Sequence, residues 1–258
     1  MRTFKYRRTA IVFFILLAAL ASAKKKLVLV RHSITEMNEY LANVQPWGTP
    51  GFVDPLYFDT RLSESGLKLA LRKNNNIKTS MASRRAFQEI ELIAASPLTR
   101  ALVTSDLILS NDVVHHSVPR IAVASAREWL FLSSDVGRKK YELQKEFPHW
   151  DFSDLSDSDA WWYTRKSSDP EPVLDFRGDT QKLYGYTGEP IDSFVARIIN
   201  LRDWLTSRKE NTIALVCHYG VLQALTGKSF ENAQILEWDP KLLLDDIEIR
   251  KQAIEIIK

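Results

Sequence analysis

Two short, uninterrupted runs of hydrophobic residues stand out along the chain, Leu27–Val30 and Ile213–Val216. Runs of this length without polar residues are typical of strands covered on both faces, as in a parallel sheet. Each run is followed two residues later by a histidine, His32 after the first and His218 after the second. If the two strands are parallel neighbours, both histidines lie side by side at the carboxyl edge of the sheet, where open α/β sheets bind ligands.

Capping residues and helical spacing predict the other elements. Ser63 is a suitable N-cap for a helix over 64–72, and Asn74-Asn75-Asn76 predicts a break after it. Ser96-Pro97 ends a strand and begins a helix whose first turn carries Arg100. Further helices are predicted over 35–43, 81–87, 141–147, 189–205, 221–226 and 241–258, and further strands over 89–95, 118–123 and, at an edge, 232–238.

The predicted fold is a three-layer α/β domain over residues 24–258, with a mostly parallel sheet and helices on both faces. Residues 129–190 interrupt this order. Beyond one short helix the segment is rich in Asp, Ser, Gly and Pro, with interspersed tryptophans and no periodicity. A long segment of this kind between core elements is typical of a lid or insertion. Trp161 and Trp162 are expected to pack beneath it.

Residues 1–23 have the composition of a secretory signal peptide. Cations precede a 12-residue apolar core, and Ala21-Ser22-Ala23 is a small-residue cleavage site. We expect cleavage after Ala23, entry into the secretory pathway and secretion, with no stable membrane span left in the mature chain. The alternative is an uncleaved signal anchor that holds the protein at a membrane.

The charge balance changes once this segment is set aside. The net charge of +3 includes the four cations Arg2, Lys5, Arg7 and Arg8, and residues 24–258 hold 31 basic against 32 acidic side chains. That balance gives no basic excess that would indicate nucleic-acid binding. Cys217 is the only cysteine, which excludes an intramolecular disulfide.

Five short motifs follow one another along the chain. They are Arg31-His32-Ser33-x-Thr35-x-x-Asn38, Asp59-x-x-Leu62-Ser63-x-x-Gly66, Ser96-Pro97-Leu98-x-Arg100-Ala101-x-x-Thr104, Arg127-Glu128 and Cys217-His218-Tyr219-Gly220. In this order they resemble the histidine phosphatase (phosphoglycerate mutase-like) superfamily over roughly residues 26–238. Ser33 and Tyr219 depart from its pattern, because glycine is usual at both positions. The resemblance is closest to phosphoglycerate mutase-like proteins of plants, algae and other eukaryotes.

The resemblance implies phosphoryl transfer through a phosphohistidine. His32 is the implied nucleophile, since a neutral imidazole nitrogen can attack phosphorus. Glu128 is the implied general acid, which protonates the leaving oxygen and then takes a proton from the attacking water. For the first step the pKa of Glu128 must be raised by burial. His218, if protonated, would add a positive charge.

The same resemblance assigns residues that hold the substrate. Arg31 and Arg100 would bind the phosphoryl oxygens with bidentate donors that keep their charge. Thr35 and Asn38 are predicted polar contacts to the substrate, and Tyr219 is predicted to narrow the site or to contact the substrate. This scheme requires no metal and no cofactor, and the sequence shows no obvious cluster of metal ligands.

The predicted activity is hydrolysis of a small phosphomonoester by a histidine phosphatase. Secreted acid phosphatases and phytases of the superfamily usually carry Arg-His-Gly-x-Arg-x-Pro, and Thr35 and Met37 at the last two positions argue against that branch. Two alternatives stay open: a phosphoglycerate mutase-type phosphotransferase, and a catalytically inactive phospholigand-binding protein, for which Ser33 and Tyr219 would be the evidence. The sequence predicts neither the natural substrate nor an oligomeric state.

Overall fold

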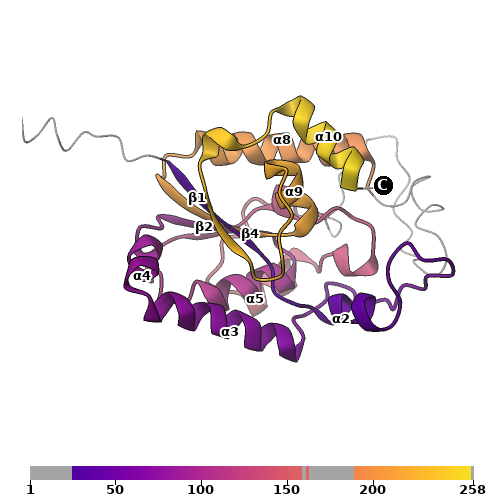
Figure 1. The fold of residues 1–258 in the computed structure, drawn as a ribbon, viewed down its shortest axis with the longest axis horizontal. Coiled ribbons are helices and arrows are strands. Elements are labelled where there is room, and N and C mark those ends of the chain that lie inside the picture. The colour runs from indigo at the N-terminus through magenta and orange to yellow at the C-terminus, as the bar shows by residue number, and fades with distance from the viewer. Residues whose placement is uncertain (1–24, 159–160, 163–188, 257–258) are drawn as a thin grey trace, which may run out of the picture.

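The strands of the described chain form one sheet in the order β3-β2-β4-β1-β5. Strands β1, β2 and β4 of this sheet are labelled in Figure 1. The computed structural model describes residues 25–158, 161–162 and 189–256. Neighbouring strands are parallel except for β5, which pairs antiparallel with β1 at one edge. The mostly parallel sheet and its last edge strand are therefore confirmed. The strand bounds are β1 Lys26–Arg31, β2 Leu92–Ala95, β3 Arg120–Ala122, β4 Thr212–Cys217 and β5 Ile235–Trp238.

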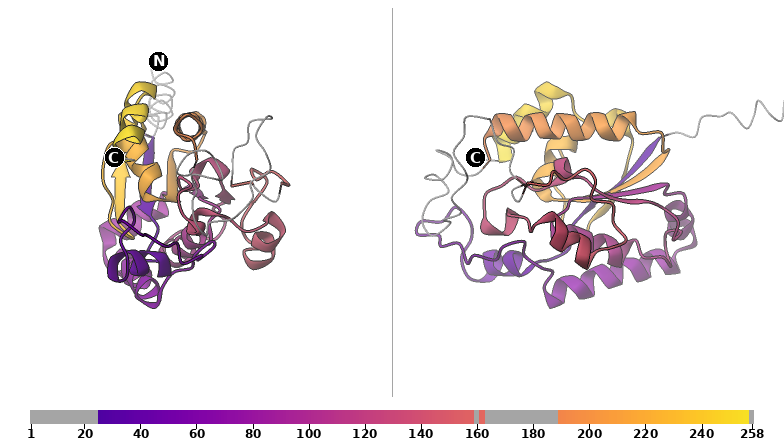
Figure 2. Two further views of the ribbon diagram at one scale, coloured as in Figure 1. Left: turned by 90° about the vertical axis from the view of Figure 1, so that its right-hand side faces the viewer. Right: turned by 180° about the vertical axis from the view of Figure 1, so that it is seen from behind.

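Helices cover both faces of this sheet (Figure 2). The uninterrupted apolar run of β1 is divided between the two faces, because successive side chains of a strand point in opposite directions. Val28 and Val30 pack in the core beneath α3, α4 and α5, whereas Leu27 and Leu29 pack in the core beneath α8, α9 and α10. The helix bounds are α2 Glu36–Asn43, α3 Glu64–Thr79, α4 Met81–Gln88, α5 Thr99–Ile108, α6 Lys140–Glu146, α8 Ile191–Ser207, α9 Tyr219–Thr226 and α10 Asp246–Ile256.

The predicted break at Asn74-Asn75-Asn76 is wrong, because α3 continues through it to Thr79. Asn74 is buried, and its side-chain nitrogen donates to the carbonyl of Ile108 and to the Ser110 hydroxyl, each at 3.0 Å. Ile77 is also buried, one helical turn further on. Tertiary contacts therefore override the weak helix propensity of three asparagines.

The helix that carries Arg100 begins later than predicted. Pro97 precedes the N-cap Leu98, and the first helical residue is Thr99. No side chain of α5 caps this end; instead Asp59, from a distant loop, accepts a hydrogen bond from the Thr99 backbone N–H at 2.8 Å. The cap comes from 40 residues away in sequence, which local sequence signals do not reveal.

The predicted lid, residues 129–190, is described only in part, because residues 159–160 and 163–188 lie outside the described residues. Its described portion contains α6 and packs on the domain. Trp161 and Trp162 are buried, as predicted. Gly137 allows the approach of Trp161, because a Cβ at position 137 would lie 2.3 Å from the indole ring.

The predicted signal peptide also falls outside the described residues. Within residues 25–158, 161–162 and 189–256, no helix combines the length and the apolar character needed to cross a bilayer. The C-terminal helix starts at Asp246, five residues later than predicted, since a short 3-10 turn over Pro240–Leu242 precedes it.

Replacing Gly66 by alanine should destabilise the fold strongly. The start of α3 lies against the loop after β1, and a Cβ at position 66 would lie 1.9 Å from the Ile34 carbonyl oxygen. Because that neighbour is backbone, the loop itself must move, and we expect a loss of about 2–3 kcal/mol in the free energy of unfolding. Urea unfolding followed by circular dichroism measures this loss. Lys68→Ala, at an exposed position of the same helix, is the control, and an equal effect of both substitutions would contradict the steric argument.

Candidate active site

His32 and His218 lie side by side at the carboxyl edge of the sheet. β1 and β4 are parallel neighbours, and Arg31 lies opposite Cys217, so the residue after each strand leaves the sheet at the same place. The centres of the two imidazole rings are 5.1 Å apart. Both rings are buried, with exposed fractions of 4% for His32 and 0% for His218. The predicted pairing of the two histidines is thus confirmed.

One ring nitrogen of His32 is held by the backbone, and the other keeps its lone pair. Its Nδ1 lies 2.7 Å from the carbonyl oxygen of Ser33. A carbonyl only accepts, so Nδ1 carries the hydrogen and Nε2 retains the lone pair. Burial lowers the pKa of His32 well below its usual value, and the charges of Arg100 and Arg31 lower it further. The imidazole is therefore neutral at neutral pH, the form that attacks phosphorus.

His218 is neutral as well, so the positive charge that it would add if protonated is absent. Burial lowers its pKa, and Arg100, His32, Arg197 and Arg31 all act in the same direction. Arg100 Nε donates to His218 Nδ1 at 3.3 Å. Because an arginine N–H cannot accept, Nδ1 must be the unprotonated nitrogen and Nε2 carries the hydrogen. That buried Nε2 has no hydrogen-bond partner among the described residues, so it remains available as a donor.

Arg31 lies beside the two histidines, and one of its guanidinium nitrogens is left without a hydrogen-bond partner in the described part of the chain. Its Nη1 donates to the Phe230 carbonyl at 2.7 Å, and the guanidinium lies over the ring of Tyr219 at 5.2 Å from its centre. Its buried Nε has no partner within the described part of the chain. Tyr219 therefore supports Arg31 through a cation–π contact. The predicted contact of Tyr219 with a substrate stays a prediction.

Glu128 meets the requirement for a general acid. Burial raises the pKa of its carboxyl group, and the nearby carboxylate of Asp135 raises it further. The N–H of Trp129, the charge of Arg100 and the N–H of Gly220 lower this pKa, but they do not outweigh the increase. The Gly220 N–H donates to Glu128 Oε2 at 3.3 Å. A Cβ at position 220 would lie only 2.8 Å from Glu128 Oε1, so the glycine makes room for the carboxyl group beside His218.

Thr35 and Asn38 form the capping box of α2. The Thr35 hydroxyl accepts from the Asn38 backbone N–H at 3.0 Å, and the Asn38 side-chain oxygen accepts from the Thr35 N–H at 3.2 Å. Asn232 also donates to that oxygen at 3.2 Å. These bonds fix the loop that follows His32. The predicted contacts of Thr35 and Asn38 with a substrate stay predictions.

Ser33, one of the two departures from the family pattern, has a structural role. Its hydroxyl donates to the Gly66 carbonyl at 2.7 Å, and its backbone N–H donates to the Thr104 hydroxyl at 2.9 Å. The side chain is fully buried and tied to the start of α3. Ser33 therefore joins the loop after β1 to its neighbours and leaves the reacting groups of the site unchanged.

A buried ion-pair network fixes the loop that carries Glu128. The Glu189 carboxylate accepts from Arg127 at 2.9 Å and from Arg197 at 2.6 Å, and the exposed fractions of the three side chains are 1%, 4% and 4%. Arg197 also donates to the carbonyls of Ser125, Arg127 and Glu128 at 3.0, 2.7 and 3.3 Å. Helix α8 thus holds the backbone around the acid in place. Sequence reasoning missed Glu189 and Arg197, because no local motif marks contacts between residues about 70 positions apart.

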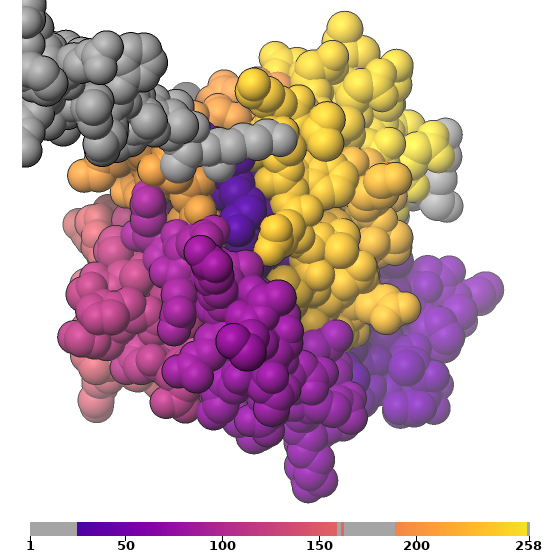
Figure 3. All heavy atoms as spheres, turned by 60° about the vertical axis from the view of Figure 1, so that its left-hand side comes forward, coloured from indigo at the N-terminus to yellow at the C-terminus, as the bar shows by residue number. Residues whose placement is uncertain are grey.

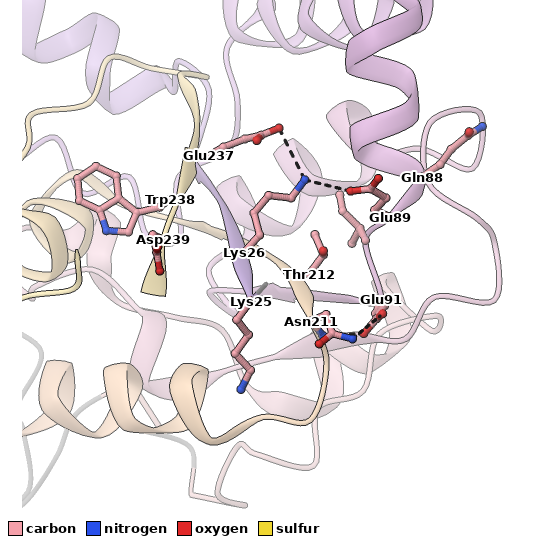
Figure 4. Close-up of a pocket in the computed structure, with 11 residues that line it drawn as sticks. Lys25, Lys26, Gln88, Glu89, Glu91, Asn211, Thr212, Glu237, Trp238 and Asp239 are labelled. Carbon is pink, nitrogen blue, oxygen red and sulfur yellow. Dashed lines mark hydrogen bonds and ion pairs between the residues drawn. The ribbon is translucent and has the colours of Figure 1, made fainter. Parts of the chain in front are cut away.

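A hollow of about 690 Å³ lies at the opposite, amino end of the strands. Figure 3 views this face, where the start of β1 (indigo) lies between the α3–α4 segment (purple) and the C-terminal segment (yellow). Lys26 lies between Glu89 at 3.3 Å and Glu237 at 3.9 Å (Figure 4). These charges are paired with one another, and the histidines lie at the other edge of the sheet. In the described ranges, no group of three or more His, Cys, Asp or Glu residues is placed to hold a metal ion.

The chain is similar to one known protein family and to several solved structures. The family model described as the histidine phosphatase superfamily (branch 1) matches residues 27–246. Among solved structures, phosphoglycerate mutase from Bacillus anthracis matches 89% of this chain and 98% of its own length, at 16% identity and a TM-score of 0.49. Alpha-ribazole phosphatase from Shigella flexneri matches 82% and 89%, at 18% identity and a TM-score of 0.46. A mycobacterial glucosyl-3-phosphoglycerate phosphatase matches 85% and 94%, at 18% identity and a TM-score of 0.43. No curated protein sequence matches.

Proposed function

Because the chain belongs to the histidine phosphatase superfamily (branch 1), we propose that it hydrolyses a small phosphomonoester through a phosphohistidine on His32, without a metal. The observation that carries this proposal is the protonation pattern of the site. His32 presents a lone pair on Nε2, His218 presents a hydrogen on Nε2, and burial favours the protonated form of Glu128. The nucleophile and the oxyanion donor therefore present the atoms that the reaction needs, and the raised pKa of Glu128 extends the pH range in which it can act as the general acid.

The first step forms a bond between His32 Nε2 and phosphorus while the bond to the leaving oxygen breaks. Glu128 gives its proton to that oxygen, which departs as an alcohol. Arg31 and the Nε2–H of His218 donate to the other phosphoryl oxygens, and the positive charge of Arg100 stabilises them electrostatically. In the second step water attacks phosphorus, Glu128 takes the proton of the water, and the bond to His32 breaks to release phosphate.

The same proposal covers three finer points. We propose that the nearest branch of the superfamily is the phosphoglycerate mutase-like proteins of plants, algae and other eukaryotes, and that residues 1–23 direct the chain into the secretory pathway. We favour an active enzyme over a silent binding protein because Ser33 is engaged with Gly66 and does not disturb the reacting groups. A secreted chain also works away from cytosolic glycolysis, which favours hydrolysis over mutase activity.

Hydrolysis of an aryl phosphate by the purified chain, with and without a chelator, tests the proposal. We expect turnover that resists the chelator, and protein-bound phosphate that is labile in acid and stable in alkali, the behaviour of a phosphoramidate. Phosphoglycerate isomers should be hydrolysed faster than they are interconverted. Faster interconversion would instead identify a mutase. Absence of turnover and of bound phosphate across acid to neutral pH, with several phosphomonoesters, would overturn the proposed catalysis.

A further inference from the structure

The carboxylate of Asp135 is buried and forms an ion pair with Arg100, a residue of the candidate active site. Its Oδ1 accepts from Arg100 Nη2 at 2.9 Å, and its Oδ2 accepts from the backbone N–H groups of Phe131 and Leu132 at 3.2 and 3.0 Å. The Ser134 carbonyl accepts from Arg100 Nη1 at 2.5 Å. Burial raises the pKa of Asp135, but three donors on two oxygens favour the ionised carboxylate. The turn over Ser133–Asp135 therefore holds both terminal nitrogens of Arg100.

With its two terminal nitrogens held in this way, Arg100 directs its Nε–H at His218 Nδ1. We propose that Asp135 is a positioning residue of the phosphatase reaction, which fixes the guanidinium of Arg100 and through it the nitrogen of His218 that carries the hydrogen. The chain of contacts is continuous and buried, with side-chain exposed fractions of 4% for Arg100 and 8% for Asp135. Its catalytic consequence depends on the proposed function, whereas its effect on His218 does not.

Asp135 also faces Glu128. Among the described residues, the other charged or titratable groups that act electrostatically with Glu128 are Arg100, Arg31 and Cys217. The negative charge of Asp135 raises the pKa of Glu128, and therefore extends the protonated acid to higher pH. Since the first step needs protonated Glu128, kcat/KM falls as pH rises through that pKa. Removal of the Asp135 charge lowers the pKa of Glu128 and should shift this fall to lower pH.

Asp135→Asn in the full chain tests the proposal, because asparagine keeps the shape and loses the charge. Nitrogen NMR of isotope-labelled histidine should show wild-type His218 neutral with its hydrogen on Nε2, and a mixture of the two neutral tautomers in the variant. We expect kcat/KM for an aryl phosphate to fall on the order of 100-fold, the scale of a small misplacement of a catalytic group. The high-pH limb of the profile should move to lower pH.

Asp54→Asn is the matched control. Asp54 accepts from the Ser133 backbone N–H at 2.8 Å and supports the same turn, but it does not contact Arg100. If Asp135 only supported the turn, both variants would behave alike, and this result would overturn the proposal. An unchanged His218 tautomer in Asp135→Asn would also overturn it. If Asp135→Asn does not fold, nitrogen NMR of the wild-type protein still tests the proposal. A wild-type His218 that carries its hydrogen on Nδ1, or that is protonated at neutral pH, would overturn it. If the His218 tautomer changes in Asp135→Asn but the wild-type protein shows no turnover, the phosphatase function is rejected. The proposed chain of contacts from Asp135 through Arg100 to His218 is then still supported.

Discussion

Replacement of His32 by alanine should abolish turnover and the protein-bound phosphate together. No other described group combines a neutral imidazole lone pair with Arg31, Arg100 and the His218 donor around it. Loss of a covalent nucleophile typically lowers kcat by about 10⁴-fold or more, since the remaining groups can only bind the substrate. Steady-state hydrolysis of an aryl phosphate, with alkaline trapping of labelled phosphate on the protein, measures both losses.

The control for this experiment is His115→Ala. His115 is exposed in a turn, with its Nδ1 near the Ser117 hydroxyl, and has no contact with the site. This variant should keep wild-type turnover and trapped phosphate. If the His32 variant still formed alkali-stable protein phosphate, the nucleophile would be a different residue and the assignment of His32 would be wrong. Because the alanine leaves a small cavity beside His218, circular dichroism should confirm that the fold is retained.

The central part of this site could be predicted from the sequence because it depends on two strands. Leu27–Val30 and Ile213–Val216 are apolar without interruption, and such runs belong in the middle of a parallel sheet. Once β1 and β4 are neighbours, the position of His32 beside His218 follows from the register alone. The nature of the residues at the strand ends then indicates the chemistry.

The protonation of the site could not be predicted in the same way. The sequence left open whether His218 is protonated, whereas in the structure burial and Arg100 keep it neutral. That result depends on which nitrogen Arg100 Nε reaches, and Asp135, 35 residues away in sequence, helps to fix it. Local motifs identify the residue types, whereas the direction of each hydrogen bond is set by the fold around them.

The same distinction explains the error at Asn74. Three consecutive asparagines have a low helix propensity, and propensity is the only signal available locally. In the folded chain, Asn74 is buried and bonded to the end of α5, which the sequence of α3 alone does not reveal. The supporting contacts of Asp59, Glu189 and Arg197 were overlooked for the same reason, although Asp59 itself stands in the second of the five motifs. Their partners lie between 8 and 79 residues away, and most come from different elements.

Glu189→Gln should cause the largest loss of stability among the substitutions considered. Glutamine cannot neutralise Arg127 and Arg197, both of which are buried with the Glu189 carboxylate between them. Removal of one partner from a buried ion pair typically costs about 3–5 kcal/mol, because the remaining charge is left uncompensated. The loop of Glu128 is held by Arg197, so activity should fall as well. Chemical denaturation of both proteins gives the difference in the free energy of unfolding.

Glu146→Gln is the control for this prediction. Glu146 also binds two arginines, so the comparison shows whether burial causes the large effect at Glu189. Glu146 accepts from Arg61 and Arg138, each at 2.8 Å, but its side chain is 33% exposed. Solvent screens such pairs, so we expect a loss of no more than about 1 kcal/mol. Equal losses in the two variants would show that burial does not set the strength of the Glu189 network.

The pH dependence of the Glu189 effect provides a second test. Burial opposes ionisation of Glu189, but Arg197 and Arg127 outweigh it and hold the pKa below its usual value. A carboxyl group whose pKa is lowered by folding contributes stability above its unfolded pKa of about 4.3, and that contribution is lost as pH falls through the folded pKa. The difference between wild type and Glu189→Gln should therefore be largest near neutral pH and should shrink in acid. A difference that stays constant down to acid pH would mean that the glutamate contributes by packing alone, and that the charge on Glu189 does not hold the Glu128 loop.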